Sequence, residues 1–217
     1  MLDAGWSPYK IAKTLGRPPK TIMREIVNRA VSATGRVTVE TTVANDTGEA
    51  RAQDVDFVVR GPDSPHPVAR RAHKVVARPG ETAFSVSFDV PGHKLWSPDV
   101  PNVYELAAGD FRTTFGFRDF RLVKGWFTLN GKRVFLKSTH TGGQVPGGLA
   151  VPHVATPELE FKDFQLLKAM GFNCVRFIAG QATPRQLDFC DRLGLMVYQE
   201  TMAGWELKDG PETRRRY

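Results

Sequence analysis

The sequence lacks any long run of apolar residues, and it contains little cysteine or histidine. No stretch approaches the ~18 residues that a membrane-spanning helix needs, so no membrane contact is expected. The N-terminus MLDAGWSPYK has no apolar signal-peptide core, from which we expect a cytoplasmic protein. The two cysteines, Cys174 and Cys190, are expected to be free buried thiols. Because the histidines do not cluster near them, we expect no metal site and no cofactor.

Composition and charge place the chain among ordinary globular proteins. Its 217 residues are 41% hydrophobic and 24% charged, with room for one large domain or two to three small ones. The net charge is +7, and the first thirty residues hold six basic and two acidic side chains. A basic head on a nearly neutral body suggests anion binding there, for example to nucleic acid.

Residues 1–30 have the pattern of two helices joined by a tight turn. Ser7 and Pro8 suit a helix start, and Gly16 suits its end. A second helix is expected from Lys20 to about Arg29. The string GWSPYKIAKTLGRPPKTIMREI resembles the helix-turn-helix of transposases of insertion sequence family 30. That resemblance implies DNA contacts by Lys20, Thr21 and Arg24. The alternative from the pattern alone is a helical hairpin with a solvated basic face.

Residues 35–122 alternate between apolar and polar side chains in short segments separated by turn residues. Examples are Val37, Val39, Thr41 and Val43 before the turn Asn45-Asp46-Thr47-Gly48. This pattern predicts an immunoglobulin-like antiparallel β-sandwich.

Residues 123–200 switch to alternating strands and helices, which is typical of a parallel sheet. We expect about three strands of an incomplete (β/α)8 barrel, followed by a tail at 201–217. The expected elements are strand 134–137, a glycine-rich loop at 140–151, a helix capped by Thr156, strand 173–176, a helix capped by Thr183 and strand 195–198. The first helix is expected to bury Leu159, Phe164, Leu166, Leu167 and Met170. The third strand would have an unpaired edge.

The strings LWSPDVPNVYELA (95–107) and TTFGFRDFRLVKGWFTLNGKRVFLKS (113–138) resemble glycoside hydrolase family 2. This family contains β-galactosidases, β-glucuronidases and β-mannosidases. The resemblance implies an immunoglobulin-like domain leading into a catalytic barrel that hydrolyses β-glycosides with retention. We expect structural roles for Trp96 and Gly116-Phe117-Arg118, where the two domains join.

Three positions receive substrate-binding roles by that resemblance. NCVR is similar to the family's N-A-V-R, whose arginine reaches the sugar site, and this implies Arg176. CDRLGLMVYQE is similar to a motif with an acidic strand-end residue, which implies Glu200. His140 stands where the family has an asparagine. The family's two catalytic glutamates lie on later strands and are absent from this sequence, so we expect no catalysis by this chain alone.

The sequence is compatible with more than one hypothesis about the whole chain. The chain is expected to be a fragment of a family 2 hydrolase, a helix-turn-helix DNA-binding protein, or a chimeric reading frame with no selected activity. A carbohydrate-binding sandwich is a further alternative. The sequence predicts no oligomeric state.

Overall fold

The computed structural model describes residues 22–26, 30–31, 33–141, 156–178, 181–200 and 210–216. The chain divides between Val134 and Phe135 into two compact units, which are described one at a time. Among these described residues, no helix is both long and apolar enough to cross a membrane.

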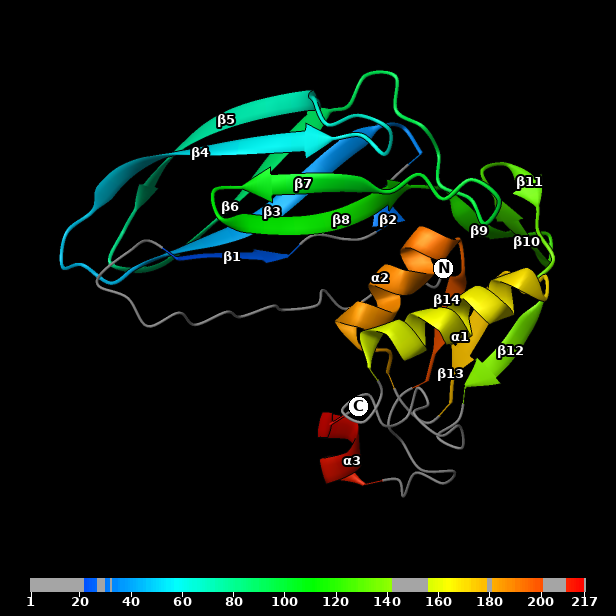
Figure 1. Ribbon diagram of the computed structural model, residues 1–217. Helices are drawn as coiled ribbons and strands as arrows, with labels where there is room; N and C mark the ends of the chain where they lie inside the picture. The colour runs from blue at the N-terminus through cyan, green and yellow to red at the C-terminus, as the bar shows by residue number, and fades with distance from the viewer. Residues whose placement is uncertain are drawn as a thin grey trace. The chain divides into compact units, whose positions relative to one another are not determined.

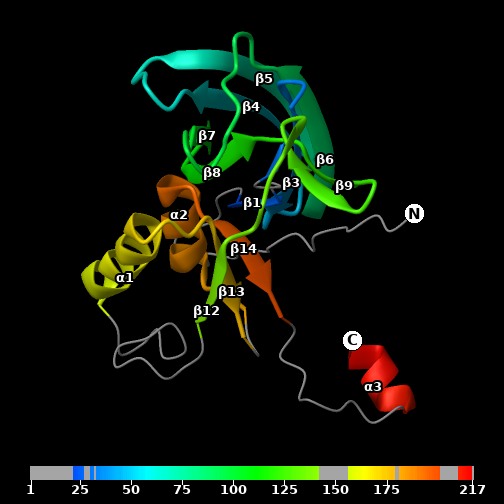
Figure 2. The ribbon, with the colours of Figure 1, turned by 90° about the vertical axis from the view of Figure 1, so that its right-hand side faces the viewer.

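The first unit is a β-sandwich. One sheet has the strand order β1-β3-β6 and the other the order β2-β8-β7-β4-β5, and the two form separate layers in Figures 1 and 2. The strands are β1 Ile22–Ile26, β2 Ala30–Val31, β3 Arg36–Asn45, β4 Arg51–Arg60, β5 Pro67–Ala77, β6 Gly80–Asp89, β7 Tyr104–Ala108 and β8 Phe111–Phe117.

Alternation of apolar residues along the long strands builds the sandwich core, as predicted. In β3 every second residue from Val37 to Val43 is buried, and Val37 lies opposite Phe88 of β6 in the antiparallel register. The side chains of Val55, Phe57 and Val59 on β4 are buried by the same alternation. Burying a side chain of this size contributes about 2 kcal/mol. The immunoglobulin-like arrangement follows from two sheets that each present one apolar face.

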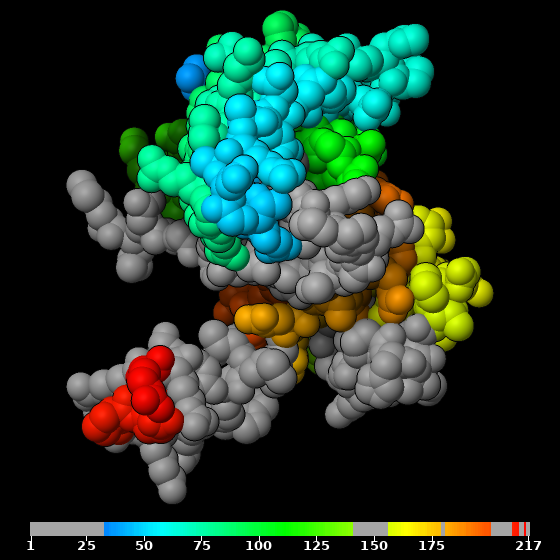
Figure 3. Space-filling model, turned by 90° about the vertical axis from the view of Figure 1, so that its left-hand side faces the viewer, coloured from blue at the N-terminus to red at the C-terminus, as the bar shows by residue number. Residues whose placement is uncertain are grey.

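The edge strand β5 carries charged side chains that oppose pairing with another chain. Arg70, Arg71 and Lys74 are exposed along it. The cyan and blue-green atoms in Figure 3 belong to the segment that contains β4 and β5. Arg70 Nε donates a hydrogen bond of 2.7 Å to Asp56 Oδ2 on β4. This hydrogen bond, together with the guanidinium charge, lowers the pKa of Asp56. Charge on an exposed edge strand is a common protection against edge-to-edge association.

The N-terminal helix predicted from Lys20 to Arg29 is wrong over residues 22–26. These residues form strand β1, which pairs antiparallel with β3 from Ile22↔Ala44 to Ile26↔Glu40. The prediction rested on Ile22 and Ile26, but residues four apart share a face in a strand as well as in a helix. The backbone pairing that β3 offers therefore decides between the two. Residues 1–21 and 27–29, including Lys20 and Thr21, lie outside the described residues.

A small three-stranded sheet ends the first unit. It consists of β9 Phe120–Val123, β10 Trp126–Leu129 and β11 Lys132–Arg133, joined in the order β11-β10-β9. Both connections have two residues with positive φ, Lys124-Gly125 and Asn130-Gly131, as two-residue hairpins prefer.

Asn130 also links this small sheet to the corner at Trp96. Its Nδ2 donates to the Trp96 carbonyl at 3.0 Å, and its Oδ1 accepts from Asp119 N–H at 2.9 Å. Trp96 is 2% exposed, and a Cβ on Gly116 would lie 3.0 Å from its Cβ. The structural role expected for Trp96 is therefore confirmed, because its ring is packed inside the unit.

The second unit starts as a parallel β/α structure. Strands β12, β13 and β14 pair in that order, all parallel, and Figures 1 and 2 show helices α1 and α2 on one face of the sheet. The elements are β12 Ser138–Thr141, α1 Pro157–Ala169, β13 Cys174–Phe177, α2 Pro184–Leu193, β14 Met196–Gln199 and α3 Pro211–Arg216. The helix starts at Thr156 and Thr183 are as predicted, since each threonine side chain accepts from the backbone of its own helix. The three strands fit the expected partial barrel.

The first barrel strand lies four residues later than predicted. Residues 134–137 are not in a strand, and β12 begins at Ser138. We attribute the shift to Asn173, because its Oδ1 accepts from Lys137 N–H at 2.8 Å and its Nδ2 donates to the Phe135 carbonyl at 2.9 Å. These bonds occupy main-chain groups of the apolar stretch. His140, expected in a loop, is consequently inside strand β12, whereas residues 142–151 of the expected loop lie outside the described residues.

Helix α1 buries less of its apolar stripe than predicted. Phe164 is fully buried and Leu167 packs against the core of this unit. Leu159, Leu166 and Met170 are 41%, 52% and 72% exposed, so their prediction as core residues is wrong. The three-stranded sheet with α2 covers only one stripe of α1, which is narrower than the run of apolar residues.

Candidate functional site

His140, Arg176 and Tyr198 form a row across the three parallel strands. The register places His140 of β12 opposite Arg176 of β13, and Arg176 opposite Tyr198 of β14. Residues directly opposite each other point to the same side of a sheet. The neighbouring β13 residues Val175 and Phe177 are buried in the core with α1 and α2. The row therefore lies on the face that turns away from the helices.

An ion pair joins this row to the end of β14. Arg176 Nε donates a hydrogen bond of 2.6 Å to Glu200 Oε1, and its Nη2 also contacts that oxygen. Glu200 directly follows β14, where its N–H donates to the Phe177 carbonyl at 3.2 Å. The side chains are 45% and 23% exposed. An ion pair this exposed stabilises the fold by no more than about 1 kcal/mol. Its main effect is therefore to orient the Arg176 guanidinium.

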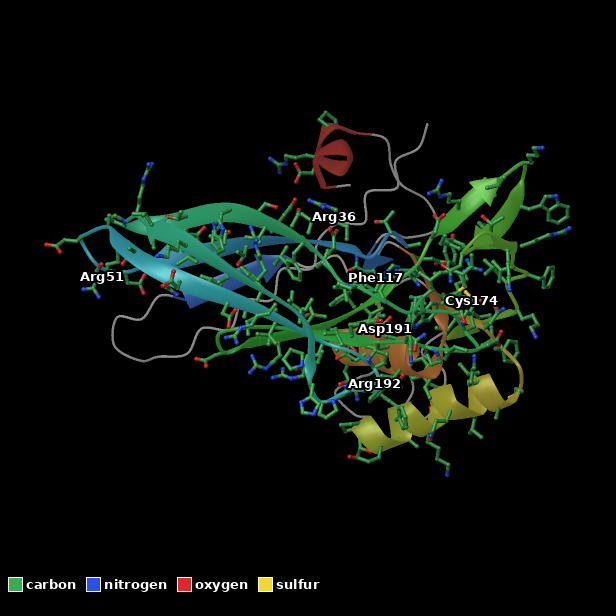
Figure 4. The ribbon with its side chains drawn as sticks, turned by 90° about the horizontal axis from the view of Figure 1, so that it is seen from above. Arg36, Arg51, Phe117, Cys174, Asp191 and Arg192 are labelled. Atoms are coloured by element: carbon green, nitrogen blue, oxygen red, sulfur yellow. The ribbon has the colours of Figure 1, made fainter. Side chains whose placement is uncertain are left out.

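On the same face of the sheet, the residues two positions before Arg176 and Tyr198 are apolar. Cys174 and Met196 are 3% and 6% exposed, and Cys174 is labelled on β13 in Figure 4. Burial raises the pKa of the Cys174 thiol, against the opposing effect of its hydrogen bond with Ser138. Burial also raises the pKa of Cys190 in α2. Both cysteines are free and buried, as predicted, and such thiols are poor nucleophiles at neutral pH.

A buried polar network holds the segment that follows β13. Thr183 and Gln186 form a reciprocal capping box at the start of α2. Gln186 Nε2 donates to Glu160 Oε1 of α1 at 3.3 Å, and Arg185 Nε donates to Glu160 Oε2 at 2.7 Å. On the other side, Ala182 N–H donates to Gln199 Oε1 of β14 at 2.8 Å. The chain is thus fixed on both sides just beyond the strand that carries Arg176.

Glu200 is the one carboxylate among the described residues of these strands and their ends. Retaining glycosidases use two carboxyl groups about 5–5.5 Å apart. Across the described part of the chain, no three His, Cys, Asp or Glu side chains cluster as metal ligands would. The described strands therefore present polar and charged side chains on this face, but they do not contain an acid and nucleophile pair.

The structure brings two of the three predicted substrate-binding residues into direct contact. Arg176 and Glu200 form the ion pair, and His140 occupies the neighbouring position in the row. Tyr198 was missed by the sequence reasoning. The signal was its position two residues before Glu200, which puts both on one strand face. Of the predicted DNA-contacting residues, Arg24 belongs to strand β1 rather than a recognition helix.

Comparison with protein families assigns both units to one family. The model of glycosyl hydrolases family 2 matches residues 24–118, and the TIM barrel domain model of the same family matches residues 120–207. The chain belongs to glycosyl hydrolase family 2. The first match also begins within β1, in agreement with the pairing of that strand in the sandwich.

Individual relatives agree with this assignment. A putative beta-glucuronidase of Formosa agariphila is 36% identical over 140 residues, which are 59% of this chain and 13% of the relative. A beta-galactosidase of Thermoanaerobacterium thermosulfurigenes is 30% identical over 132 residues, 56% of this chain and 18% of the relative. The structure of Parabacteroides merdae beta-glucuronidase matches with a TM-score of 0.61 and 28% identity, covering 82% of this chain and 23% of that one. Apo Bacteroides uniformis beta-glucuronidase 3 matches with a TM-score of 0.67 and 26% identity, covering 89% and 25%.

The chain spans less than a fifth of the length of these sequence relatives and about a quarter of the matched structures. Relatives named as beta-glucuronidases and relatives named as beta-galactosidases both match this chain over about half to two thirds of its length.

Proposed function

We propose that this chain supplies one wall of the sugar site of a family 2 β-glycosidase. The observation that carries the proposal is the Arg176–Glu200 ion pair at the carboxyl end of the parallel strands. Barrel enzymes place their sites at this end. Arg176 and His140 offer hydrogen-bond donors, and Glu200 accepts, so the three suit the hydroxyl groups of a sugar.

In this proposal Arg176 orients the substrate and does not transfer a proton, because a guanidinium stays protonated throughout the physiological range. Glu200 holds Arg176 in place. Hydrolysis of the β-glycosidic bond needs an acid and a nucleophile, two carboxyl groups that are not assigned to Arg176, His140 or Glu200 in this proposal. The activity is therefore proposed for this segment joined to the remainder of a barrel, and binding is proposed for the segment itself.

Binding of a neutral and an anionic probe tests the proposal. Saturation-transfer NMR on the 217-residue chain with p-nitrophenyl β-D-galactoside and p-nitrophenyl β-D-glucuronide is expected to detect contact with at least one of them. Arg176→Ala is expected to abolish the transfer. Arg192→Ala is the matched control, because Arg192 is an exposed arginine on α2 that no described contact links to the row.

Equal transfer in the wild type and Arg176→Ala would show that the ligand binds elsewhere and would sink the proposal. Absence of transfer from both probes at millimolar concentration would do the same. Release of p-nitrophenol by this chain alone is expected to stay at the buffer rate. Turnover by the chain itself would place the chemistry within these residues and contradict the assignment.

A further inference from the structure

Arg176 is contacted from β14 by two side chains on the same strand face. Glu200 receives the guanidinium edge through Nε and Nη2. The ring of Tyr198 lies beside the guanidinium, with its centroid 5.6 Å from Arg176 Cζ. That separation falls within the ~6 Å over which a cation interacts with an aromatic face. One contact is a charge-assisted hydrogen bond to the guanidinium nitrogens, and the other places the guanidinium carbon over the aromatic ring.

Among the described residues of the second unit, packing does not account for Tyr198. Its side chain is 55% exposed, whereas the other β14 residue on this face, Met196, is buried. The core of the second unit is formed by residues on the helix side of the sheet and does not include Tyr198.

We infer that Tyr198 is a positioning residue, whose ring together with Glu200 holds the Arg176 guanidinium ready for a sugar. The inference rests on the proposed function for its purpose, but the contact itself is independent of any ligand. An arginine side chain has many rotamers, and ordering them costs conformational entropy. When Tyr198 and Glu200 order the Arg176 side chain before the sugar binds, the free energy of binding no longer includes that entropic cost.

The inference separates the ring of Tyr198 from its hydroxyl group. Tyr198→Phe keeps the aromatic face and is expected to hold Arg176 as the wild type does. Tyr198→Leu removes the face and leaves the Glu200 contact. Phe135→Leu, a change at a 77% exposed aromatic of the same unit, is the matched control.

Hydrogen exchange of arginine Nε–H groups, followed by NMR at mildly acidic pH, measures directly how firmly the Arg176 guanidinium is held. In Tyr198→Leu, exchange at Arg176 is expected to rise about two- to fivefold, the ratio that corresponds to an exposed cation–π contact. Arg185 is an internal reference, because its Nε–H also donates to a carboxylate, that of Glu160. Its exchange is expected to stay unchanged, as are the backbone amide spectra.

Each other outcome overturns the inference. Unchanged exchange at Arg176 in Tyr198→Leu would show that the ring of Tyr198 does not hold the guanidinium. An equal rise in Tyr198→Phe would assign the effect to the hydroxyl group. A rise at Arg185 as well would show general loosening of the unit.

The saturation-transfer assay separates this inference from the proposed function. If exchange behaves as expected but the wild type binds neither sugar probe, Tyr198 holds Arg176 and the sugar site is wrong. If the probes bind in an Arg176-dependent way and Tyr198→Leu binds and exchanges like the wild type, the sugar site stands and the role of Tyr198 is refuted.

Discussion

The side-chain oxygen of Asn173 accepts a hydrogen bond from the backbone N–H of Lys137, 36 residues earlier, at 2.8 Å. Its amide nitrogen donates to the Phe135 carbonyl, and its own N–H donates to the Lys137 carbonyl at 3.1 Å. One residue thereby ties the entry of β12 to the start of β13.

Removing this side chain is expected to destabilise the second unit. Asn173→Ala loses two hydrogen bonds to the main chain and should lower the free energy of unfolding by about 2 kcal/mol. Gln181→Ala, at an exposed position of the same unit, is the control and should have little effect. Urea denaturation followed by circular dichroism measures both. Equal midpoints for the two variants would remove Asn173 as the reason for the late start of β12.

Gly35 is expected to tolerate no side chain. Its φ is +81°, and an added Cβ would lie 2.3 Å from Nδ1 of the His93 ring. The ring is tied to the Ala33 carbonyl through Nε2 at 2.8 Å, so it cannot move away without losing that bond. Gly35→Ala should destabilise the sandwich by about 2 kcal/mol or more.

The control for this change is Gly48→Ala, because a Cβ there meets nothing within 4 Å. Its stability should stay within about 0.5 kcal/mol of the wild type. Thermal unfolding of both variants is the measurement. A stable Gly35→Ala protein would show that the loop before β3 shifts at little cost.

Glu160 is expected to be the most sensitive charged residue of the second unit. It is 1% exposed and accepts from both Arg185 and Gln186. Glu160→Ala leaves these donors without their acceptor and should cost about 3 kcal/mol. Glu158→Ala in the same helical turn is exposed and should cost less than about 1 kcal/mol, mainly through the helix N-terminus. Similar unfolding midpoints for the two variants would contradict a buried network.

Alkaline pH is expected to weaken the second unit through its two thiols. Burial raises the pKa of Cys174, and it raises the pKa of Cys190 well above the ordinary value. A raised pKa means that the folded state keeps the proton longer. The stability contribution is therefore fully present below the unfolded-state pKa of about 8.5 and is lost progressively as pH rises above it.

Urea midpoints measured between neutral pH and about pH 10 should fall, and the fall should be smaller in Cys190→Ala. A thiol reagent should react with the native chain much more slowly than with the unfolded chain. Identical pH slopes for the variant and the wild type would show that other groups cause the alkaline loss.

The sequence by itself determined the elements whose periodicity or capping is strong. Alternation specified the long sandwich strands, and Thr156-Pro157 and Thr183-Pro184 specified the starts of α1 and α2, because these signals act over a few neighbouring residues. The motifs around Arg176 and Glu200 also pointed to residues that the fold brings together. The free, buried state of both cysteines also agrees with the expectation from the sequence.

Only the tertiary structure decided the features that depend on a distant partner. The IMREI segment became β1 because β3 offers an antiparallel partner, and a spacing of four residues fits both strand and helix. The start of β12 depends on Asn173, a full helix further along the chain. The role of Tyr198 depends on register across strands, which the local pattern of one strand does not contain. Local propensity acts between near neighbours, whereas pairing, burial and register are set by residues that meet only in the folded chain.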